Sequence, residues 1–521
     1  MPKIVYLPLD ERPCNYGYPQ QLAAMTELKL VAPERPLLGW KKKPADTAAL
    51  SRWLLKEAQD ADYLIVSVDL LVYGGIVPSR LHGMPAEECL RRLAVLGEIK
   101  RSRPSVRIHA FNLIMRVPDN DTDEEEPDYY RLYGKAIFRY GYLTDKRERE
   151  GLSDAEEREL DHLQRQIPDG VLRDFIGRRR VNRQVNQHVI ELAGQGVIDQ
   201  LIIPLDDNAL YGFSSREQQR LVCRVQELKL LDRVLVYPGA DEIGCTMLAN
   251  IFCRCKGYKP EIYVRYSSTQ GPLIKPKYED RSLNESVKAH LTAAGAVMAD
   301  NSAETELILL VNSPAADQGQ MAEQIPYAQR HRSYFSEIHY REFAEALQAY
   351  LRKGKRVALG DVAVCNGGDA VLMDLLKQQG LLASLTAYAG WNTSGNTLGT
   401  VIAHLIIASY GMKLGDAAER SAVLRASRTF YYGRLIEDFI YQSIVRQDML
   451  VHDLPRLNAG YFNIGHCLEE AQRIAAAKIS RCMEYYLPDA EEGRLVLSNI
   501  HFPWVRMFEI GFDLTIEPKT T

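Results

Sequence analysis

Apolar, β-branched segments of strand length recur along the chain, and most are followed by a stretch with helical periodicity. The clearest predicted strands are residues 3–9, 63–68, 107–115, 200–205, 234–239, 306–311, 356–364 and 385–390, and weaker ones are residues 29–33 and 261–266. Their apolarity is continuous rather than alternating, which indicates that both faces are buried, as in a parallel sheet covered by helices. The pattern therefore predicts an α/β fold.

Two of the predicted helices have recognisable first turns. Ser214 and Glu217 have the spacing of a capping box, and apolar residues follow at helical spacing over 221–228. Asn396 is expected to cap a helix that ends at Gly411. Both helices follow predicted strands directly, so the polar residues lie in strand-to-helix turns.

Eight strong strand candidates with intervening helices fit a (β/α)₈ TIM-like barrel with helical insertions and a C-terminal helical region. On this interpretation residues 1–411 form the barrel, with insertions near 117–199 and 261–305, and residues 412–521 form the C-terminal region. The alternative is two doubly wound α/β domains that divide near residue 270. Ten strand candidates leave that alternative open.

The C-terminal region is predicted to be helical, and the helical periodicity of its apolar residues is strongest over 428–445 and 469–487. A short terminal strand is expected at 506–514. Its aromatic residues are expected to pack on the barrel or on a second subunit. Packing within the chain is favoured, and a homo-oligomer is left open. These aromatic residues are Tyr431, Tyr432, Phe439 and Tyr441.

Composition narrows the class of protein. With 46% hydrophobic and 25% charged residues the chain is typical of a globular protein. A formal net charge of -4 creates no field that would attract a polyanion, so no nucleic-acid partner is expected. No secretion signal and no membrane-spanning segment are recognised, and nine scattered cysteines suit a reducing compartment. We therefore expect a cytoplasmic protein with no membrane partner.

Polar side chains follow most of the predicted strands. Each one alone is an ordinary turn or cap residue, but their recurrence, with adjacent acid pairs after three strands, favours a site where the carboxyl ends of the strands meet. The candidate catalytic residues are Asp206 and Asp207, which follow the strand in "LIIPLDD". The candidate substrate-binding residues are Asp10, Arg12, Asn15, Asp69, Tyr73, Asn112, Asn208, Asp241, Glu242, Asn366, Asp369, Trp391, Asn392 and Asn396.

Three kinds of chemistry suit these residues. Carboxylates and amides with an aromatic platform, Trp391 or Tyr73, suit a small carbohydrate substrate and the acid/base cleavage of a glycosidic bond. The same oxygen-rich set suits Mg²⁺ or Mn²⁺ in a metal-dependent hydrolase or transferase. Its ligands would be Asp10, Asp69, Asp206, Asp207 and Asp241. The third interpretation is a non-catalytic binder of a carbohydrate or metabolite.

The sequence lacks the motifs of several other common catalytic mechanisms. The sequence contains no HExxH, no GxSxG and no GxxxxGK[ST]. Zinc peptidases, serine α/β-hydrolases and P-loop proteins are therefore disfavoured.

Several motifs together resemble an uncharacterised bacterial family, known only as domain of unknown function 4127. The resemblance covers the whole chain and rests on "LPLDERPCN", "LDDN", "YPGADE", "NGGDA" and "YAGWNTSGNTLGT". Because no activity is assigned to that family, the resemblance implies none.

The paired acids also resemble the site of β-N-acetylglucosaminidases that work by substrate assistance, in which adjacent carboxylates close the fourth barrel strand. The resemblance implies that Asp206 orients the acetamido group of an N-acetylated amino sugar and that Asp207, with a raised pKa, protonates the leaving oxygen. It also implies that Asn392 and Trp391 line the sugar pocket and that no cofactor is needed. The chain departs from the pattern at Asn208, which follows the pair, and in the further acids nearby, which keep Mg²⁺ or Mn²⁺ open as an alternative.

Overall fold

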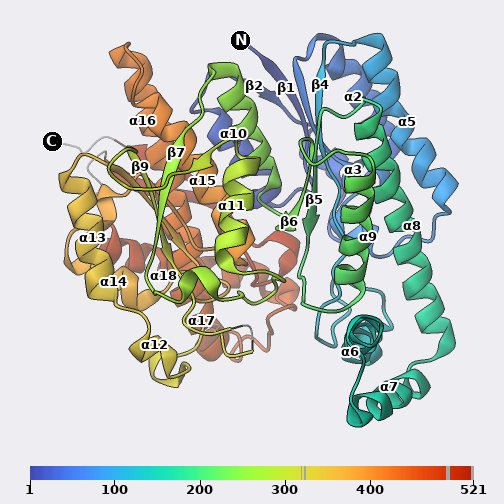
Figure 1. Cartoon of the computed structure of the whole chain (residues 1–521). Helices are drawn as coiled ribbons and strands as arrows, with labels where there is room; N and C mark the ends of the chain where they lie inside the picture. Colours follow the sequence, from blue (N-terminus) through green and yellow to red (C-terminus); the bar gives the residue numbers. More distant parts are fainter. Residues whose placement is uncertain (318, 322–323, 489–492, 518–521) are drawn as a thin grey trace. The chain divides into compact units, whose positions relative to one another are not determined.

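The computed structural model describes residues 1–317, 319–321, 324–488 and 493–517. These residues form a mixed α/β fold with one six-stranded parallel sheet, one five-stranded parallel sheet and a two-stranded hairpin (Figure 1). The chain divides into two compact units. Unit 1 comprises Met1–Tyr16, Leu28–Gly244 and Tyr278–Arg281, and unit 2 comprises Gly17–Glu27, Cys245–Lys277 and the chain from Ser282 onward.

Unit 1 is built on the first sheet, whose strand order is β2-β1-β3-β4-β5-β6. Its strands are β1 (Lys3–Leu7), β2 (Lys29–Val31), β3 (Tyr63–Ser67), β4 (Arg107–Phe111), β5 (Gln200–Leu205) and β6 (Val234–Pro238). The order reverses at β1, because β2 lies on one side of it and all later strands lie on the other. In such sheets ligands bind outside the carboxyl ends of the strands at the point of reversal, here β1 and β3.

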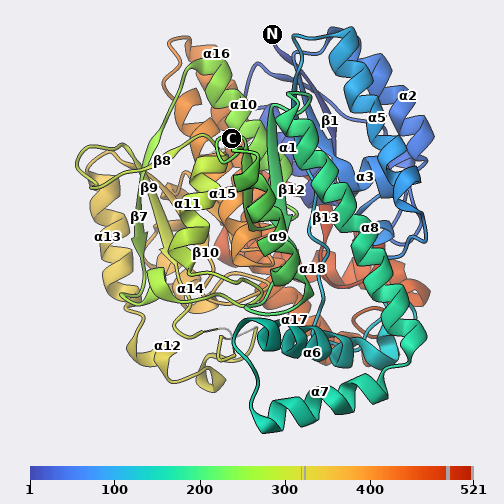
Figure 2. The ribbon, with the colours of Figure 1, turned by 45° about the vertical axis from the view of Figure 1, so that its right-hand side comes forward.

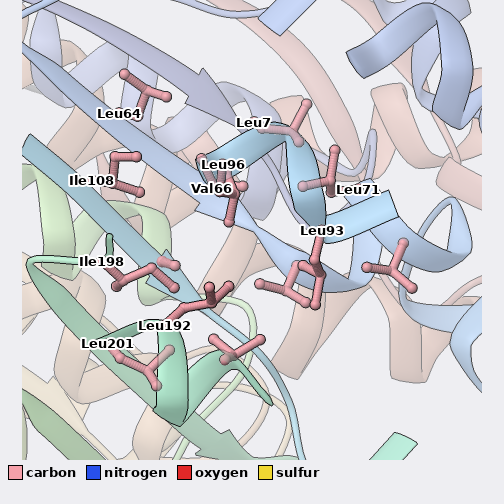
Figure 3. Packing of buried hydrophobic residues seen from close by; sticks show 14 of the residues in the cluster. Leu7, Leu64, Val66, Leu71, Leu93, Leu96, Ile108, Leu192, Ile198 and Leu201 are labelled. Atoms are coloured by element: carbon pink, nitrogen blue, oxygen red, sulfur yellow. The ribbon is translucent and has the colours of Figure 1, made fainter. Parts of the chain in front are cut away.

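Helices cover one face of this sheet (Figure 2). The helices of unit 1 are α2 (Thr47–Glu57), α3 (Val68–Tyr73), α4 (Ile76–Ser79), α5 (Ala86–Ser102), α6 (Tyr130–Arg149), α7 (Asp154–Gln166), α8 (Asp169–Gly194) and α9 (Phe213–Glu227). Leu7 and Val66 of the strands pack with Leu93 of α5 and Leu192 of α8, all fully or almost fully buried (Figure 3). This apolar layer fixes the strands and therefore the direction in which their carboxyl ends point.

Unit 2 repeats the strand arrangement of unit 1. Its strands are β7 (Glu261–Tyr266), β8 (Val297–Met298), β9 (Leu307–Asn312), β10 (Arg356–Asp361) and β11 (Ala387–Ala389), in the order β11-β10-β9-β7-β8. In both units the second strand lies outside the first, and the third, fourth and fifth follow on the other side. A hairpin of β12 (Arg494–His501) and β13 (Gly511–Glu517) completes the unit.

Helices pack on both faces of the second sheet. Those of unit 2 are α1 (Tyr18–Ala23), α10 (Ile243–Lys256, whose first two residues belong to unit 1), α11 (Leu283–Ala293), α12 (Ser333–Ser336), α13 (Tyr340–Arg352), α14 (Ala370–Gln378), α15 (Ser394–Gly411), α16 (Ala417–Arg434), α17 (Arg446–Asp448) and α18 (Leu468–Tyr486). Leu359 of β10 packs in one core cluster with Phe343 of α13 and Leu372 of α14. The next residue, Gly360, faces Val401 of α15. No helix among the described residues combines the length and apolarity needed to cross a membrane.

The predicted α/β class with parallel sheets is confirmed, and a strand forms at each of the ten predicted positions. A closed (β/α)₈ barrel is not formed by the described residues, whose main strands pair in two separate sheets, as in the alternative of two α/β domains. Apolar periodicity identifies strands but carries no information about which strands pair. Residues 261–305, expected as an insertion, contain β7 and β8 of the second sheet, whereas residues 117–199 contain α6, α7 and α8.

Two local expectations are corrected. Ser214 and Glu217 form no capping box, because the Ser214 hydroxyl donates to the Met115 carbonyl at 3.0 Å and Glu217 pairs with Arg179 at 2.7 Å. The predicted α-helix over 428–445 becomes a π-helix from Leu435 to Val445. The four aromatic residues of this region are buried in the core of unit 2, which confirms packing within the chain.

A substitution of Leu201 tests the packing of the first sheet. The side chain is fully buried, so Leu201→Ala should lower the free energy of unfolding by about 2–5 kcal/mol through lost burial and a residual cavity. Urea denaturation measures the change. Leu132→Ala is the matched control, because Leu132 is 67% exposed and its truncation should change stability by less than about 0.5 kcal/mol.

Candidate active site

The carboxyl ends of five strands of unit 1 lead into charged or amide side chains. Because the strands are parallel, these side chains lie along one edge of the sheet. They are Asp10, Arg12 and Asn15 after β1, Asp69 after β3, Asn112 and Arg116 after β4, Asp206, Asp207 and Asn208 after β5, and Asp241 and Glu242 after β6. The structure thus places most of the sequence-predicted residues on a single edge.

Arg12 joins the loops that follow β1 and β6. Its Nη2 lies 2.7 Å from Asp10 Oδ2 and 2.5 Å from Asp241 Oδ1, and Asn15 Nδ2 donates to both carboxylates at 3.0 and 2.9 Å. All four residues are more than nine-tenths buried. Burial, together with the charge of Asp10, raises the pKa of Asp241 to about 6, although Arg12 opposes the shift. Since β3, β4 and β5 separate β1 from β6 in the sheet, this contact draws two distant loops over the ends of the strands between them.

Asp69 and Asn112 form a buried pair between the ends of β3 and β4. Asp69 Oδ2 accepts hydrogen bonds from the Leu113 amide at 2.9 Å and from Asn112 Nδ2 at 3.2 Å. Asn112 Oδ1 in turn accepts from Asn186 Nδ2 at 2.7 Å. Burial raises the pKa of Asp69 to about 6 despite these hydrogen bonds. Asn112 therefore has partners for both its donor and its acceptor.

The two candidate catalytic residues are held by different arginines. Asp206 Oδ2 lies 2.6 Å from Arg80 Nη2, and Asp207 Oδ2 lies 3.2 Å from Arg116 Nη1. Burial and the charge of Asp206 raise the pKa of Asp207 to about 6, against the opposing effect of Arg116. Asp207 also has a φ of 37°, in the left-handed region that non-glycine residues rarely adopt. The paired acids thus differ in environment although they are adjacent in sequence.

Glu125 and Glu126 complete the ionic network around these arginines. Glu125 Oε2 lies 2.8 Å from Arg80 and 3.1 Å from Arg116, and Glu126 Oε1 lies 2.9 Å from Arg116 Nε. Burial raises the pKa of Glu126. From the sequence, both residues were placed only within the insertion expected near 117–199. The signal that could have identified them is their position shortly after the predicted strand that ends near Arg116.

Asn208 is the amide at this edge without side-chain partners. Its backbone N–H donates to the Tyr278 carbonyl at 2.8 Å, and the residue is 3% exposed. Neither Nδ2 nor Oδ1 of the side chain has a hydrogen-bond partner among the described residues. A buried amide in this state costs free energy unless another molecule supplies the missing donor and acceptor.

Tyr73 and Glu242 are both turned into the protein. The Tyr73 ring is 3% exposed and stacks on His82, with 4.6 Å between ring centroids, so it presents no open platform for a sugar. Glu242 Oε2 accepts from the Ala240 amide at 2.9 Å. Tyr73, at the end of α3, and Glu242, in the loop after β6, therefore both belong to the interior packing of the unit.

The remaining candidate residues belong to unit 2 and surround the second sheet. Asp369 caps α14 by accepting from the Val371 amide at 3.1 Å, and it pairs with Arg330 at 3.0 Å. Its own amide donates to Asp361 Oδ2 at 2.7 Å, while Asn312 Nδ2 donates to Asp361 Oδ1 at 2.9 Å. Burial and the charge of Asp369 raise the pKa of Asp361 to about 7. Asp369 thus belongs to a buried network at the carboxyl ends of β9 and β10.

Asn366 and Asn392 lie in the loops after β10 and β11. Both have left-handed φ values, 59° and 61°, and the Asn366 amide donates to the Asn392 carbonyl at 2.9 Å. Trp391 is 5% exposed. Asn396 is not the N-cap of α15, because the cap is Thr393, whose hydroxyl accepts from the Asn396 amide.

Three charged residues that the sequence interpretation missed support these loops of unit 2. Asp438, on the π-helical segment, accepts from the Gly390 amide at 3.0 Å, and its carbonyl accepts from the Gly368 amide at 2.9 Å. Arg434 lies 2.6 Å from Asp438 and 2.5 Å from Glu437. Burial raises the pKa of Asp438 to about 7. Two acids within the otherwise apolar "RLIEDFIY" were the available signal.

The carboxylates of both networks are engaged with arginines and amides. Within the part of the chain that the structure describes, no three His, Cys, Asp or Glu side chains are grouped so that they could hold a metal ion. The geometry that is present is instead that of charge-paired acids, which can hold or transfer protons and bind hydroxyl and amide groups.

The fold and the site together define an α/β protein with two parallel sheets and a charged carboxyl edge on the first of them. The chain belongs to the family described as "Protein of unknown function (DUF4127)", whose sequence model matches residues 4–513. This agrees with the resemblance seen in the motifs.

Further comparisons add no assigned activity. No curated protein matches the sequence. Among solved structures, a native Bacteroidetes-affiliated GH5 cellulase linked with a polysaccharide utilization locus is 9% identical, over 79% of this chain and 98% of the cellulase, with a TM-score of 0.17. A likeness of this size supports no argument about activity.

A substitution of Asp69 tests the electrostatics at the carboxyl edge of the first sheet. Its folded pKa lies above the ordinary value of 3.8, so its contribution to stability is fully present below pH about 4 and is lost as the pH rises through about 6. Asp69→Asn keeps an acceptor for both hydrogen bonds and cannot ionise. The variant should therefore gain stability relative to wild type between pH 4 and pH 8, by up to about 3 kcal/mol.

Denaturant unfolding of both proteins across this pH range measures the difference. Asp232→Asn, at an exposed position, is the control for a change of charge alone. A difference between wild type and Asp69→Asn that stays constant from pH 4 to pH 8 would contradict the assignment.

Proposed function

We propose that the protein is a glycoside hydrolase that cleaves the glycosidic bond of an N-acetylated amino sugar, with Asp206 and Asp207 as the reacting acids. One observation carries the proposal: adjacent carboxylates after β5 have unlike environments. Asp206 is charge-paired with Arg80 at 2.6 Å, whereas burial and that neighbouring charge raise the pKa of Asp207 to about 6. Two carboxyl groups separated in this way can divide the tasks of stabilising charge and supplying a proton.

The proposed reaction uses the acetamido group of the substrate as nucleophile. Its carbonyl oxygen bonds to the anomeric carbon while the bond from that carbon to the leaving oxygen breaks. Asp207 transfers its proton to the leaving oxygen. The Asp206 carboxylate accepts a hydrogen bond from the acetamido N–H and stabilises the positive charge that develops on the ring formed. Water then opens this ring, with the deprotonated Asp207 accepting the proton of the water.

Asn208 supports an amide-bearing substrate. Its buried side chain offers one unused acceptor and one unused donor beside the reacting pair. An acetamido group or a sugar hydroxyl can satisfy both. Arg80 and Arg116, fixed by Glu125 and Glu126, position the two aspartates and limit their movement.

The alternatives differ in measurable ways. A metal-dependent hydrolase or transferase would need the aspartates to exchange their arginine partners for the ion, and a chelator would abolish its activity. A non-catalytic binder would be stabilised by a sugar and would turn over no linkage.

The first test is hydrolysis of nitrophenyl glycosides that include the N-acetylglucosaminide and the N-acetylgalactosaminide, with and without EDTA. We expect release that is insensitive to EDTA. With a substrate that has a poor leaving group, Asp207→Asn should lower kcat by about 10²–10⁴-fold, because no proton reaches the leaving oxygen. The activated nitrophenyl substrates should be affected less.

Asp232→Asn is the matched control, since it removes one exposed carboxylate and should leave activity unchanged. Full activity of Asp207→Asn on the poor leaving group would refute the assignment. EDTA-sensitive release that added Mn²⁺ restores would favour the metal enzyme instead.

The pH profile gives an independent test. Asp207 must be protonated to act as an acid, so kcat/KM for a poor leaving group should fall about tenfold per pH unit above pH about 6. The Asp207→Asn variant should lose this decline. A wild-type rate that rises continuously to pH 8 would contradict a general acid at this position.

A further inference from the structure

A short turn between β2 and α2 of unit 1 presents an exposed indole among lysines. The Trp40 amide donates to the Lys43 carbonyl at 2.9 Å, and the Lys43 amide donates to the Trp40 carbonyl at 2.8 Å. Trp40 is 47% exposed, so much of this residue is accessible to a ligand. A cavity of about 400 Å³ lies against the turn, and its lining residues are Trp40, Lys41, Lys42, Lys43, Asp123 and Glu124.

The turn is held in place by two glycines. Gly39 has a φ of 75°, and a Cβ there would lie 2.5 Å from the Lys43 carbonyl oxygen. The Ala45 amide donates to the Gly74 carbonyl at 3.0 Å, and Gly74, with a φ of 88°, leaves no room for a Cβ next to Ala45. Gly74 ends α3, the helix that carries Asp69 in its first turn. The indole is therefore fixed to an element of the candidate active site.

The cavity also shares a loop with that site. Lys41 forms an ion pair with Glu124, the residue directly before Glu125 and Glu126. Those two glutamates bind the arginines that hold Asp206 and Asp207. In addition, β2 lies beside β1 in the parallel sheet, so the loop after β2 lies on the same carboxyl edge.

The composition of the cavity indicates its ligand. An exposed indole face packs against the apolar face of a sugar ring, and the surrounding polar groups bind hydroxyls. Lys41 is engaged by Glu124, and Lys42 lies 3.8 Å from Asp128, but Lys43 forms no ion pair with a described residue. One ammonium is thus available for one carboxylate. Asp123 and Glu124 in the same wall offset two of the three lysines, and the remaining single positive charge suits one carboxylate better than a polyphosphate or an anionic membrane.

We propose that this cavity is an accessory subsite that binds a hexuronic acid residue of a carbohydrate chain, with its ring on Trp40 and its carboxylate at Lys43. The subsite extends the proposed glycosidase site towards longer, acidic substrates, and this connection rests on the proposed function. The binding itself is independent of it.

Calorimetric titration of the full chain with an oligosaccharide of hexuronic acid and N-acetylated amino sugar, and with its neutral counterpart, tests the proposal. Trp40→Ala should weaken binding of the acidic oligosaccharide by about tenfold or more, and Trp40→Phe, which keeps an aromatic face, by less than about threefold. Lys43→Gln should weaken binding of the acidic oligosaccharide and leave binding of the neutral one unchanged. Thermal midpoints equal to wild type show that the variants are folded.

The outcomes separate this proposal from the glycosidase. Nitrophenyl glycosides of N-acetylated amino sugars contain no hexuronic acid residue to occupy the cavity, so Trp40→Ala should hydrolyse them at the wild-type rate. Binding that depends on Trp40, with no hydrolysis of any linkage, would retain the subsite and reject the glycosidase. Wild-type protein that binds no acidic oligosaccharide, binds it equally well after Trp40→Ala, or binds only anionic vesicles or single-stranded DNA through Trp40 would overturn the subsite.

Discussion

The carboxyl edge of the first sheet depends on the matching of buried charge. Arg12 and Arg80 are almost completely buried, and an ion removed from water costs several kcal/mol unless opposite charges and hydrogen bonds surround it. Each arginine therefore requires acids from more than one loop. Arg12 takes one from β1 and one from β6, and Arg80 takes Asp206 from the end of β5 together with Glu125. In the arrangement that satisfies these pairings, the loops bring the candidate acids to the same edge of the sheet.

The strands were predictable from sequence, whereas their grouping was not. Continuous apolar runs such as residues 200–205 report burial on both faces, which a barrel and a covered open sheet share. The choice between them depends on pairing: β5 pairs with β6, but among the described strands β6 and β7 belong to separate sheets, although both segments were predicted as strands. Pairing is decided by packing between segments far apart in the chain, and no local pattern encodes it.

The candidate site was likewise predictable from the sequence only in part. Asp69, Asp206 and Asp241 were identifiable because polar residues directly after apolar strands must lie at the carboxyl edge. Glu125 and Glu126 lie in a loop without periodicity, and their role arises only when Arg80 and Arg116 approach them. In unit 2, Asp438 acts from a π-helix, a form that hydrophobic spacing does not distinguish from an α-helix.

The two sheets share more than strand order. In unit 1 the ends of the third and fourth strands are joined by Asn112 and Asp69, and in unit 2 the corresponding ends are joined by Asn312 and Asp361. The acid in unit 1 is Asp69, which follows the third strand in the first turn of α3, and the acid in unit 2 is Asp361, the last residue of the fourth strand. In each unit burial raises the pKa of the aspartate, so each of these two pairs contains a carboxyl group that retains its proton closer to neutral pH.

The division of the chain into units also constrains the order in which the protein can fold during synthesis. Unit 1 includes Tyr278–Arg281, so the carbonyl that accepts the Asn208 amide leaves the ribosome well after the rest of that unit. Unit 2 includes Gly17–Glu27, and the Tyr18 hydroxyl donates to Glu437, 419 residues later. Domains usually fold as they emerge, N-terminal first. Because Glu437 is synthesised 419 residues after Tyr18, α1 can make this contact only after all the strands of unit 1 have been made.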